Sequence, residues 1–396
     1  MAFFPAKFLV TAMASVICVV SPAQTNSFPK SFRSYVEQAD RAAAENRLAQ
    51  AVPLYRRALK IKPTWKEGWW KLGTSLYDQD QYKAASTAFA RLLAFDPKNG
   101  TAHLFLGLCQ YELHEDAPAL AHIESARKLG ILDDSKLRSV MLYHQGLLLL
   151  RRGAFELALE ALNRLSREQP QSGEVEMALG MAMLRMLPQE LPGESSPERE
   201  IVAQIGHAQA LVAVKKFDEA KQAYAAVVQE HEQLPNIHYA YGRFLLDLHD
   251  VDAAVSEFQR EIANEPRHVM ARLQIAAARY RTDSAAGVPY AEEAVKLNPR
   301  LPFAHYVLGL LYVDVGEAAK AVPELEAAQH AFPQDAAVYF ALGNAYAKLG
   351  RKADATRARA TFARLNAAKN EASATSYGER TAGIAPPNAS YSDKPR

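Results

Sequence analysis

Residues 302–333 read PFAHYVLGLLYVDVGEAAKAVPELEAAQHAFP, and this stretch decides the fold. Gly309 and Ala321 are small, and we expect them where two amphipathic helices cross, because a larger side chain would push the helices apart. Large residues on either side of them fill the space around that crossing. Pro333 cannot continue a helix and therefore closes the segment. The stretch predicts a pair of packed helices.

The same pattern recurs along the chain in residues 66–97, 235–266 and 336–369. The closing prolines follow one another at intervals of 34 residues, once 33, in two runs: Pro63 and Pro97, then Pro266, Pro299 and Pro333. In residues 302–333 the shared positions are His305, Leu308, Gly309, Tyr312, Ala321, Leu325, Ala328 and Pro333. This 34-residue period of two amphipathic helices resembles the tetratricopeptide repeat family.

The resemblance implies an all-α fold, a right-handed superhelix (α-solenoid) of about nine to ten helix-turn-helix repeats. It places four repeats and a half repeat in residues 32–186 and five repeats in residues 201–369. Residues 187–200 separate these arrays, and their three prolines and one glycine exclude a second helix for the half repeat. We expect a hinge there, or a loop that folds back into the groove. A smaller departure, residues 131–138, replaces a closing proline.

The two ends of the chain differ from the repeats. Residues 1–23 combine Lys7, an apolar run and small residues before Ala23, which is typical of a signal peptide cleaved after Ala23. The run Phe8–Val20 is shorter than the roughly 20 residues of a membrane span, so an uncleaved anchor is the weaker alternative. We therefore expect a periplasmic or secreted protein in which residues 24–31 form a linker. Residues 370–396 have few large apolar groups and predict a disordered tail.

Composition and motifs point away from catalysis. The formal net charge of the 396 residues is +2, so nothing favours nucleic acid as a partner. Two cysteines, Cys18 and Cys109, exclude a disulfide scaffold, and Cys109 falls on the apolar face of a helix as a buried thiol. The histidines at the bulky core position, His103, His238 and His305, are interpreted as packing residues. We predict no enzyme, no cofactor and no metal site.

In the resembled family, particular positions of each first helix point into a concave groove. Carried over to this sequence, two of these positions form an apolar and aromatic stripe accompanied by arginines, and such a surface favours a docking partner. The predicted partner-binding residues are Trp70, Tyr77, Tyr111, Tyr143, Arg151, Arg185, Tyr239, Arg243, Tyr280, Arg281, Tyr306 and Phe340. The alternative is that tight winding buries much of this stripe between adjacent first helices.

These observations predict a non-enzymatic scaffold that binds a protein or peptide segment in its groove. Once the signal peptide is cleaved, we expect no stable membrane span. The alternative function is an accessory subunit that binds polysaccharide or peptidoglycan during envelope assembly, with sugar rings stacked on Trp70, Tyr77 and Tyr111. A third interpretation, an enzyme that uses a site in the loop 187–200, has no motif behind it.

Overall fold

The computed structural model describes residues 30–169 and 172–374. All regular structure in these residues is helical, with 19 α-helices and one 3₁₀ helix, η3 (Pro188–Glu190). The predicted all-α solenoid of tetratricopeptide-type repeats is confirmed as a fold class. No helix among the described residues is both long and apolar enough to cross a membrane. The predicted signal peptide and most of the predicted tail lie outside the described residues.

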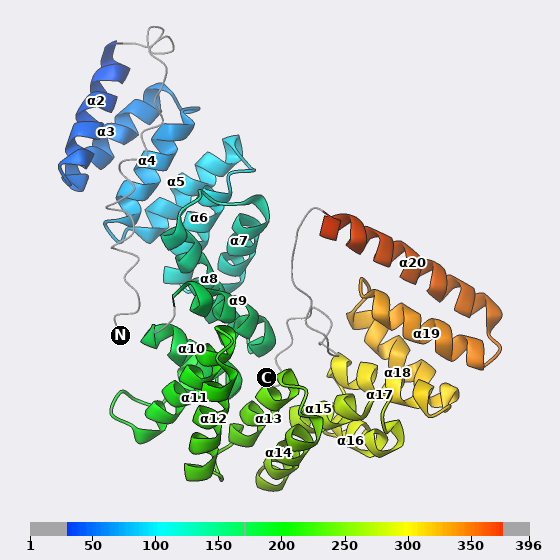
Figure 1. The fold of residues 1–396 in the computed structure, drawn as a ribbon. Coiled ribbons are helices and arrows are strands. Elements are labelled where there is room, and N and C mark those ends of the chain that lie inside the picture. The colour runs from blue at the N-terminus through cyan, green and yellow to red at the C-terminus, as the bar shows by residue number, and fades with distance from the viewer. Residues whose placement is uncertain (1–29, 170–171, 375–396) are drawn as a thin grey trace. The chain divides into compact units, whose positions relative to one another are not determined.

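The chain divides into two compact units. Figure 1 labels the helices in chain order. Unit 1 comprises the described residues up to Arg151 together with Glu156–Leu179, and unit 2 comprises Arg152–Phe155 with the described residues from Gly180 onward. The helices that lead up to this division are α2 (Lys30–Ala44), α3 (Leu48–Ile61), α4 (Lys66–Tyr77), α5 (Tyr82–Phe95), α6 (Gly100–Glu112), α7 (Asp116–Leu129), α8 (Ser135–Arg151), α9 (Phe155–Glu168) and α10 (Gly173–Met183).

The helices that follow η3 all belong to unit 2. They are α11 (Pro197–Ala213), α12 (Phe217–Glu230), α13 (Ile237–Asp247), α14 (Val251–Asn264), α15 (Val269–Arg279), α16 (Ser284–Leu297), α17 (Pro302–Asp314), α18 (Ala318–Ala331), α19 (Ala336–Lys348) and α20 (Lys352–Ala374). Each predicted full repeat holds one pair of these helices, and α10 stands in the predicted half repeat. Helix α20 continues to Ala374, so residues 370–374 are helical where the sequence predicts disorder.

Glycines mark the helix crossings as the sequence predicts. A Cβ atom built on the crossing glycine would lie 2.6–2.9 Å from the side chain 16 residues later, on the second helix of the same repeat. Real Cβ atoms essentially never approach that closely, so a larger residue at these positions would force the facing side chain to shift. The pairs are Gly73 with Phe89, Gly107 with Ile123, Gly146 with Leu162, Gly242 with Phe258, and Gly309 with Leu325.

A hydrogen bond also links many repeats to the proline that precedes them. The side chain at the bulky core position of the first helix donates to the carbonyl oxygen of the closing proline six residues earlier. The donors are Trp69 to Pro63 at 2.7 Å, His103 to Pro97 at 3.2 Å, His305 to Pro299 at 2.9 Å and Tyr339 to Pro333 at 3.0 Å. His103 and His305 are therefore packing residues that also make a hydrogen bond, because each ring packs in the repeat and donates to a proline carbonyl oxygen.

In three repeats the histidine at the bulky core position, His103, His238 or His305, uses Nδ1 to contact the residue 19 positions later. Nδ1 of His238 lies 2.6 Å from the Glu257 carboxylate, and Nδ1 of His305 lies 2.5 Å from that of Glu324. In the third repeat both members are histidines, with the Nδ1 atoms of His103 and His122 separated by 2.9 Å. We call these three contacts the repeat histidine pairs. They join the first helix of a repeat to its second helix.

Candidate functional site

One hollow opens in unit 2 on the first helices α17 and α19 and on the two residues that follow the first helix α15. We call it the α15–α17–α19 hollow, and its volume is about 360 Å³. Each of the three helices comes from a different repeat, and the predicted binding face lies on such first helices. The hollow is lined by Tyr280, Arg281, Leu310, Val313, Asp314, Phe340, Ala341, Asn344, Ala347 and Lys348.

The apolar wall of this hollow is unusually accessible. Phe340 is 45% exposed and is among the large apolar side chains that the described residues leave in solvent. Its ring is held at one edge by Phe362 of α20, with the two ring centroids 5.4 Å apart. Tyr280 follows the last residue of α15, and the guanidinium of Arg281 lies 5.2 Å from the Tyr280 ring centroid. An exposed aromatic beside a concave surface is what anchors a partner side chain.

The charged residues that line the hollow are two cations, Arg281 and Lys348, and one carboxylate, Asp314. Asp314 accepts a hydrogen bond of 2.6 Å from the Ser284 hydroxyl, which occupies one of its oxygens. Lys348 donates to the carbonyl oxygen of Val313 at 2.5 Å, and Arg281 is exposed. The half-buried amide of Asn344 has no hydrogen-bond partner among the described residues. The hollow therefore offers two cations, one carboxylate and one free amide to a ligand.

Three of the twelve predicted partner-binding residues, Tyr280, Arg281 and Phe340, line this hollow. Leu310 and Ala341 were missed from that prediction. Leu310 and Asn344 both directly follow the crossing glycine of their repeat. This repeat position could therefore have identified Leu310 from the sequence. Conversely, no described hollow brings all twelve residues together, because they lie in both units.

Five of the predicted partner-binding residues are buried in the chain. The exposed fractions are 4% for Tyr77, 3% for Tyr143, 6% for Arg185, 2% for Tyr239 and 7% for Tyr306. Neighbouring helices cover these side chains, as the alternative of tight winding predicts. Such residues stabilise the stack and offer little area to a ligand.

The remaining four predicted residues are half-buried and already engaged within the chain. Trp70 packs edge-on against Phe89 and Phe105. The Arg151 guanidinium lies 4.3 Å from the Tyr111 ring centroid and pairs with Asp116 at 2.8 Å, whereas Arg243 donates to the Tyr239 hydroxyl at 3.3 Å. With Tyr77 buried as well, the three aromatics proposed to stack on sugar rings already have partners within the chain.

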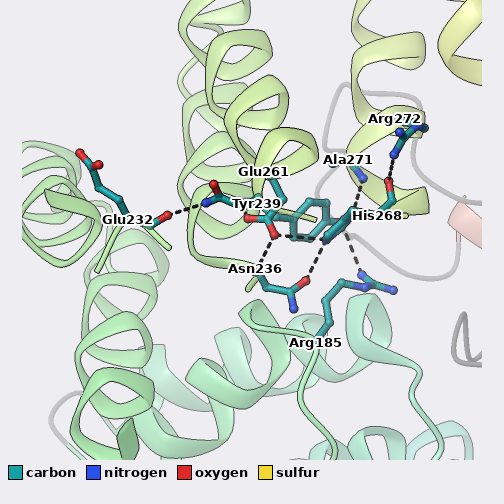
Figure 2. A network of polar contacts seen from close by, with 9 residues as sticks. Arg185, Glu232, Asn236, Tyr239, Glu261, His268, Ala271 and Arg272 are labelled. Carbon is teal, nitrogen blue, oxygen red and sulfur yellow. Dashed lines mark hydrogen bonds and ion pairs between the residues drawn. The ribbon is translucent and has the colours of Figure 1, made fainter. Parts of the chain in front are cut away.

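A buried polar network surrounds the start of α13 (Figure 2). The fully buried Glu261 carboxylate accepts hydrogen bonds from the backbone N–H groups of Asn236 at 2.7 Å and Tyr239 at 3.1 Å. It thereby caps α13, whose preceding residue Asn236 has a positive φ of 66° and provides no side-chain cap. Burial raises the pKa of Glu261, and the two N–H donors oppose that rise.

The same network contains the one cluster of possible metal ligands found among the described residues, Glu261, Glu265 and His268. Nδ1 of His268 accepts a hydrogen bond from the N–H of Ala271 at 2.9 Å, so Nε2 carries the proton and donates to the Asn236 side-chain oxygen at 2.9 Å. Because both ring nitrogens are engaged, His268 has no lone pair for a cation. The cluster acts as a structural cap.

The remaining cysteine of the described residues is also structural. Cys109 is free and buried on α6, and burial raises the pKa of its thiol to about 12. A thiol with so high a pKa is a poor nucleophile at neutral pH, because the thiolate is the reactive form. This agrees with its expected place on the apolar face of a helix.

Three family models match the chain. Two are described as tetratricopeptide repeat, one over residues 71–135 and 205–269 and the other over residues 141–172. The third is described as bacterial transcriptional activator domain and matches residues 246–369, less than a third of the chain. No curated protein sequence matches the chain.

Several solved structures are similar to parts of the chain. MamA from Desulfovibrio magneticus RS-1 has 21% identity and a TM-score of 0.38, covering 45% of this chain and 98% of its own. YrrB, described as a TPR protein with an unusual peptide-binding site, has 16% identity and a TM-score of 0.38, covering 43% and 88%. Yeast Tom70 has 12% identity and a TM-score of 0.33, covering 85% of each chain.

Proposed function

We propose that this chain, parts of which match tetratricopeptide-repeat models, is a non-enzymatic scaffold that holds a segment of a partner protein in the α15–α17–α19 hollow. The main observation that supports this proposal is Phe340, a large aromatic side chain that is 45% exposed and lines a hollow of about 360 Å³. A partner that buried this ring would remove apolar area from water, which is the main favourable term in such association.

The polar groups of the hollow support a protein segment as its occupant. The free amide of Asn344 can donate to and accept from a peptide backbone, and Arg281 and Lys348 can pair with a carboxylate. Phe340 and Tyr280 supply aromatic anchors beside them. A protein segment can contact all of these residues at once, because it carries an apolar side chain for the aromatic rings, a backbone for the amide and a carboxylate for the cations.

Photo-crosslinking at position 340 tests this proposal. We expect a photoreactive phenylalanine analogue in place of Phe340, introduced in the native cells, to capture a partner protein and to map the crosslink to one short segment. Phe217 provides the matched control, because it is also an exposed phenylalanine, 41% exposed, but begins the second helix α12. Capture that is equal at positions 217 and 340, or that occurs at 217 alone, would contradict the proposal.

A substitution series gives the expected magnitude. Phe340→Ser should weaken binding of the captured segment about 30-fold or more, since truncation of an anchoring residue typically costs about 2 kcal/mol or more. Phe217→Ser should leave the dissociation constant unchanged, and circular dichroism should show equal helix content in both variants. Retained affinity in Phe340→Ser would show that the ring is not an anchor.

The proposed site of action is the periplasm or the exterior of the cell, supported by the signal-like composition of residues 1–23. N-terminal sequencing of the protein purified from its native cells checks this. We expect the mature chain to begin at Gln24, after cleavage at Ala23. An intact Met1 on protein recovered from the cytoplasm would refute export.

A further inference from the structure

A second hollow, of about 350 Å³, lies in unit 1 on helices α7, α8 and α9, and we call it the α7–α8–α9 hollow. Four arginines from these three helices surround it, Arg127, Arg138, Arg164 and Arg167, and Glu168 is the one acidic residue of its lining. Its floor includes Met141 and Leu142, which are 6% and 5% exposed. The combination is an apolar floor inside a ring of positive charge.

The hollow lies where the repeat spacing departs from its period. Helix α7 ends at Leu129, Gly130 takes a positive φ of 82°, and α8 begins at Ser135, without the proline that closes most other repeats. Leu129 at the end of α7 and Leu132 in the connection are 44% and 45% exposed. Residues 131–138, where the sequence departs from the repeat pattern, therefore coincide with an exposed apolar side chain, Leu132, and with a residue of the hollow, Arg138.

The positive charge of this hollow is not neutralised by its own lining. Arg127 is exposed and has no ion-pair partner among the described residues. Arg138 pairs with Asp133 at 3.0 Å and Arg164 with Glu160 at 2.8 Å, but both carboxylates lie outside the lining and both pairs are solvent-exposed. Exposed pairs of this kind contribute little and exchange readily for a stronger partner. A ligand with carboxylates can therefore recruit these arginines.

We propose that the α7–α8–α9 hollow is a second binding site, which takes an acidic amphipathic protein segment. Carboxylates of the segment pair with Arg127 and Arg164, and one apolar side chain rests on Met141 and Leu142. Arginine favours this ligand because its planar guanidinium matches a carboxylate with two parallel hydrogen bonds. Methionine on the floor adapts to apolar side chains of different shape.

Nucleic acid is a poorer fit to the same residues. The apolar floor gives nothing to a phosphate, and Glu168 at the rim repels a polyanion. The formal net charge of +2 provides no general attraction for one. The site also lies in unit 1, whereas the α15–α17–α19 hollow lies in unit 2, so failure of either proposal leaves the other standing.

A labelled peptide tests this site on the full chain. The probe is a short fluorescein-labelled peptide in which pairs of glutamates alternate with leucine, and its binding is followed by fluorescence anisotropy. We expect the double variant Arg127→Gln with Arg164→Gln to raise the dissociation constant at least tenfold, because each substitution removes a charge-assisted hydrogen bond to the segment. Added salt should weaken binding to the unaltered protein.

Arg91→Gln is the matched control. Arg91 is exposed on α5 and occupies the same place in its repeat as Arg164, but it does not line the hollow. It should bind the probe like the unaltered protein. A peptide with glutamine in place of glutamate should bind at least tenfold more weakly, and so should one with serine in place of leucine.

Several outcomes would overturn the proposal. They are no binding of the probe by the unaltered protein, an equal loss in Arg91→Gln, or full affinity in the double variant. Full affinity of the glutamine peptide would show that charge does not matter, and full affinity of the serine peptide would show the same for the floor. Tighter binding of a single-stranded RNA of the same charge, lost in the double variant, would assign the site to nucleic acid instead.

Discussion

Gly180→Ala is expected to lower the free energy of unfolding of unit 2 by about 3 kcal/mol, the upper part of the range for overpacked cores. The second helix of this half repeat is missing, and α11 packs on α10 in its place. A Cβ atom at position 180 would lie 1.8 Å from the backbone oxygen of Val202. A backbone oxygen cannot rotate away as a side chain does, so the two helices must move apart.

Hydrogen exchange measures this effect locally. The amides of α10 and α11 should lose protection in Gly180→Ala by an opening free energy of about the same 3 kcal/mol. Gly343→Ala is the control, because the nearest atom to its Cβ would be the Cγ atom of Arg359, at 3.1 Å on a flexible side chain, and the other neighbours would lie at an ordinary 3.8 Å. Alanine is the better helix former, so the control should change stability by less than about 1 kcal/mol in either direction. Equal protection in Gly180→Ala and the unaltered protein would show that α10 and α11 tolerate separation.

Acid should destabilise unit 1 through His144. This side chain is fully enclosed on α8, where its ring contacts Tyr111 and Tyr143, and burial with the nearby Arg151 lowers its pKa from 6.5 to about 4. The folded protein holds the ring neutral, with Nδ1–H donated to the carbonyl oxygen of Val140 at 2.8 Å. The unfolded chain takes up a proton as pH falls below 6.5, and the folded chain does so only near pH 4. Stability therefore falls across this window, by about 3 kcal/mol at 1.4 kcal/mol per pKa unit.

Tryptophan fluorescence during urea unfolding follows this loss, because Trp65, Trp69 and Trp70 all lie in unit 1. The control is His144→Phe, which keeps an aromatic ring in place and removes the titrating group. Between pH values above 6.5 and near 4, the unaltered protein should lose about 3 kcal/mol more than the variant does. The same loss in both proteins would mean that His144 does not set the acid sensitivity of unit 1.

The repeat pattern was enough to predict the helix pairs, because their determinants are local. Small residues such as Gly73 and Gly309 mark a crossing within one repeat, and the closing prolines mark its end. The turn between the two helices could not be predicted from residue type. A residue with positive φ recurs in this turn, but its side chains are chemically diverse: Asn46, Asp80, His114, Gly153, Lys215, His249, Arg281, Gly316 and Gly350. Backbone geometry is conserved there among the repeats while residue preference is not.

The binding face was predicted only in part, because exposure depends on the neighbouring repeat. Tyr306 and Phe340 occupy the same position in successive repeats, yet their exposed fractions are 7% and 45%. What differs is the cover that adjacent helices provide, and this is not encoded within a single repeat. The capping role of Glu261 escaped prediction for the same reason, since its partners Asn236 and Tyr239 lie 25 and 22 residues away in the sequence.

The repeat histidine pairs give the fold an evolutionary freedom. With Glu324 opposite, the pKa of His305 is raised, so its contribution to stability is present at acid pH and is lost as pH rises through that raised pKa. With His103 opposite, burial and the second ring lower the pKa of His122, so that pair is weakened as pH falls below 6.5. The two pH dependences differ because the partner position, 19 residues after the core histidine, holds glutamate in one repeat and histidine in the other. The repeats of His103 and His305 thus respond to acidity in opposite directions, although they share one architecture.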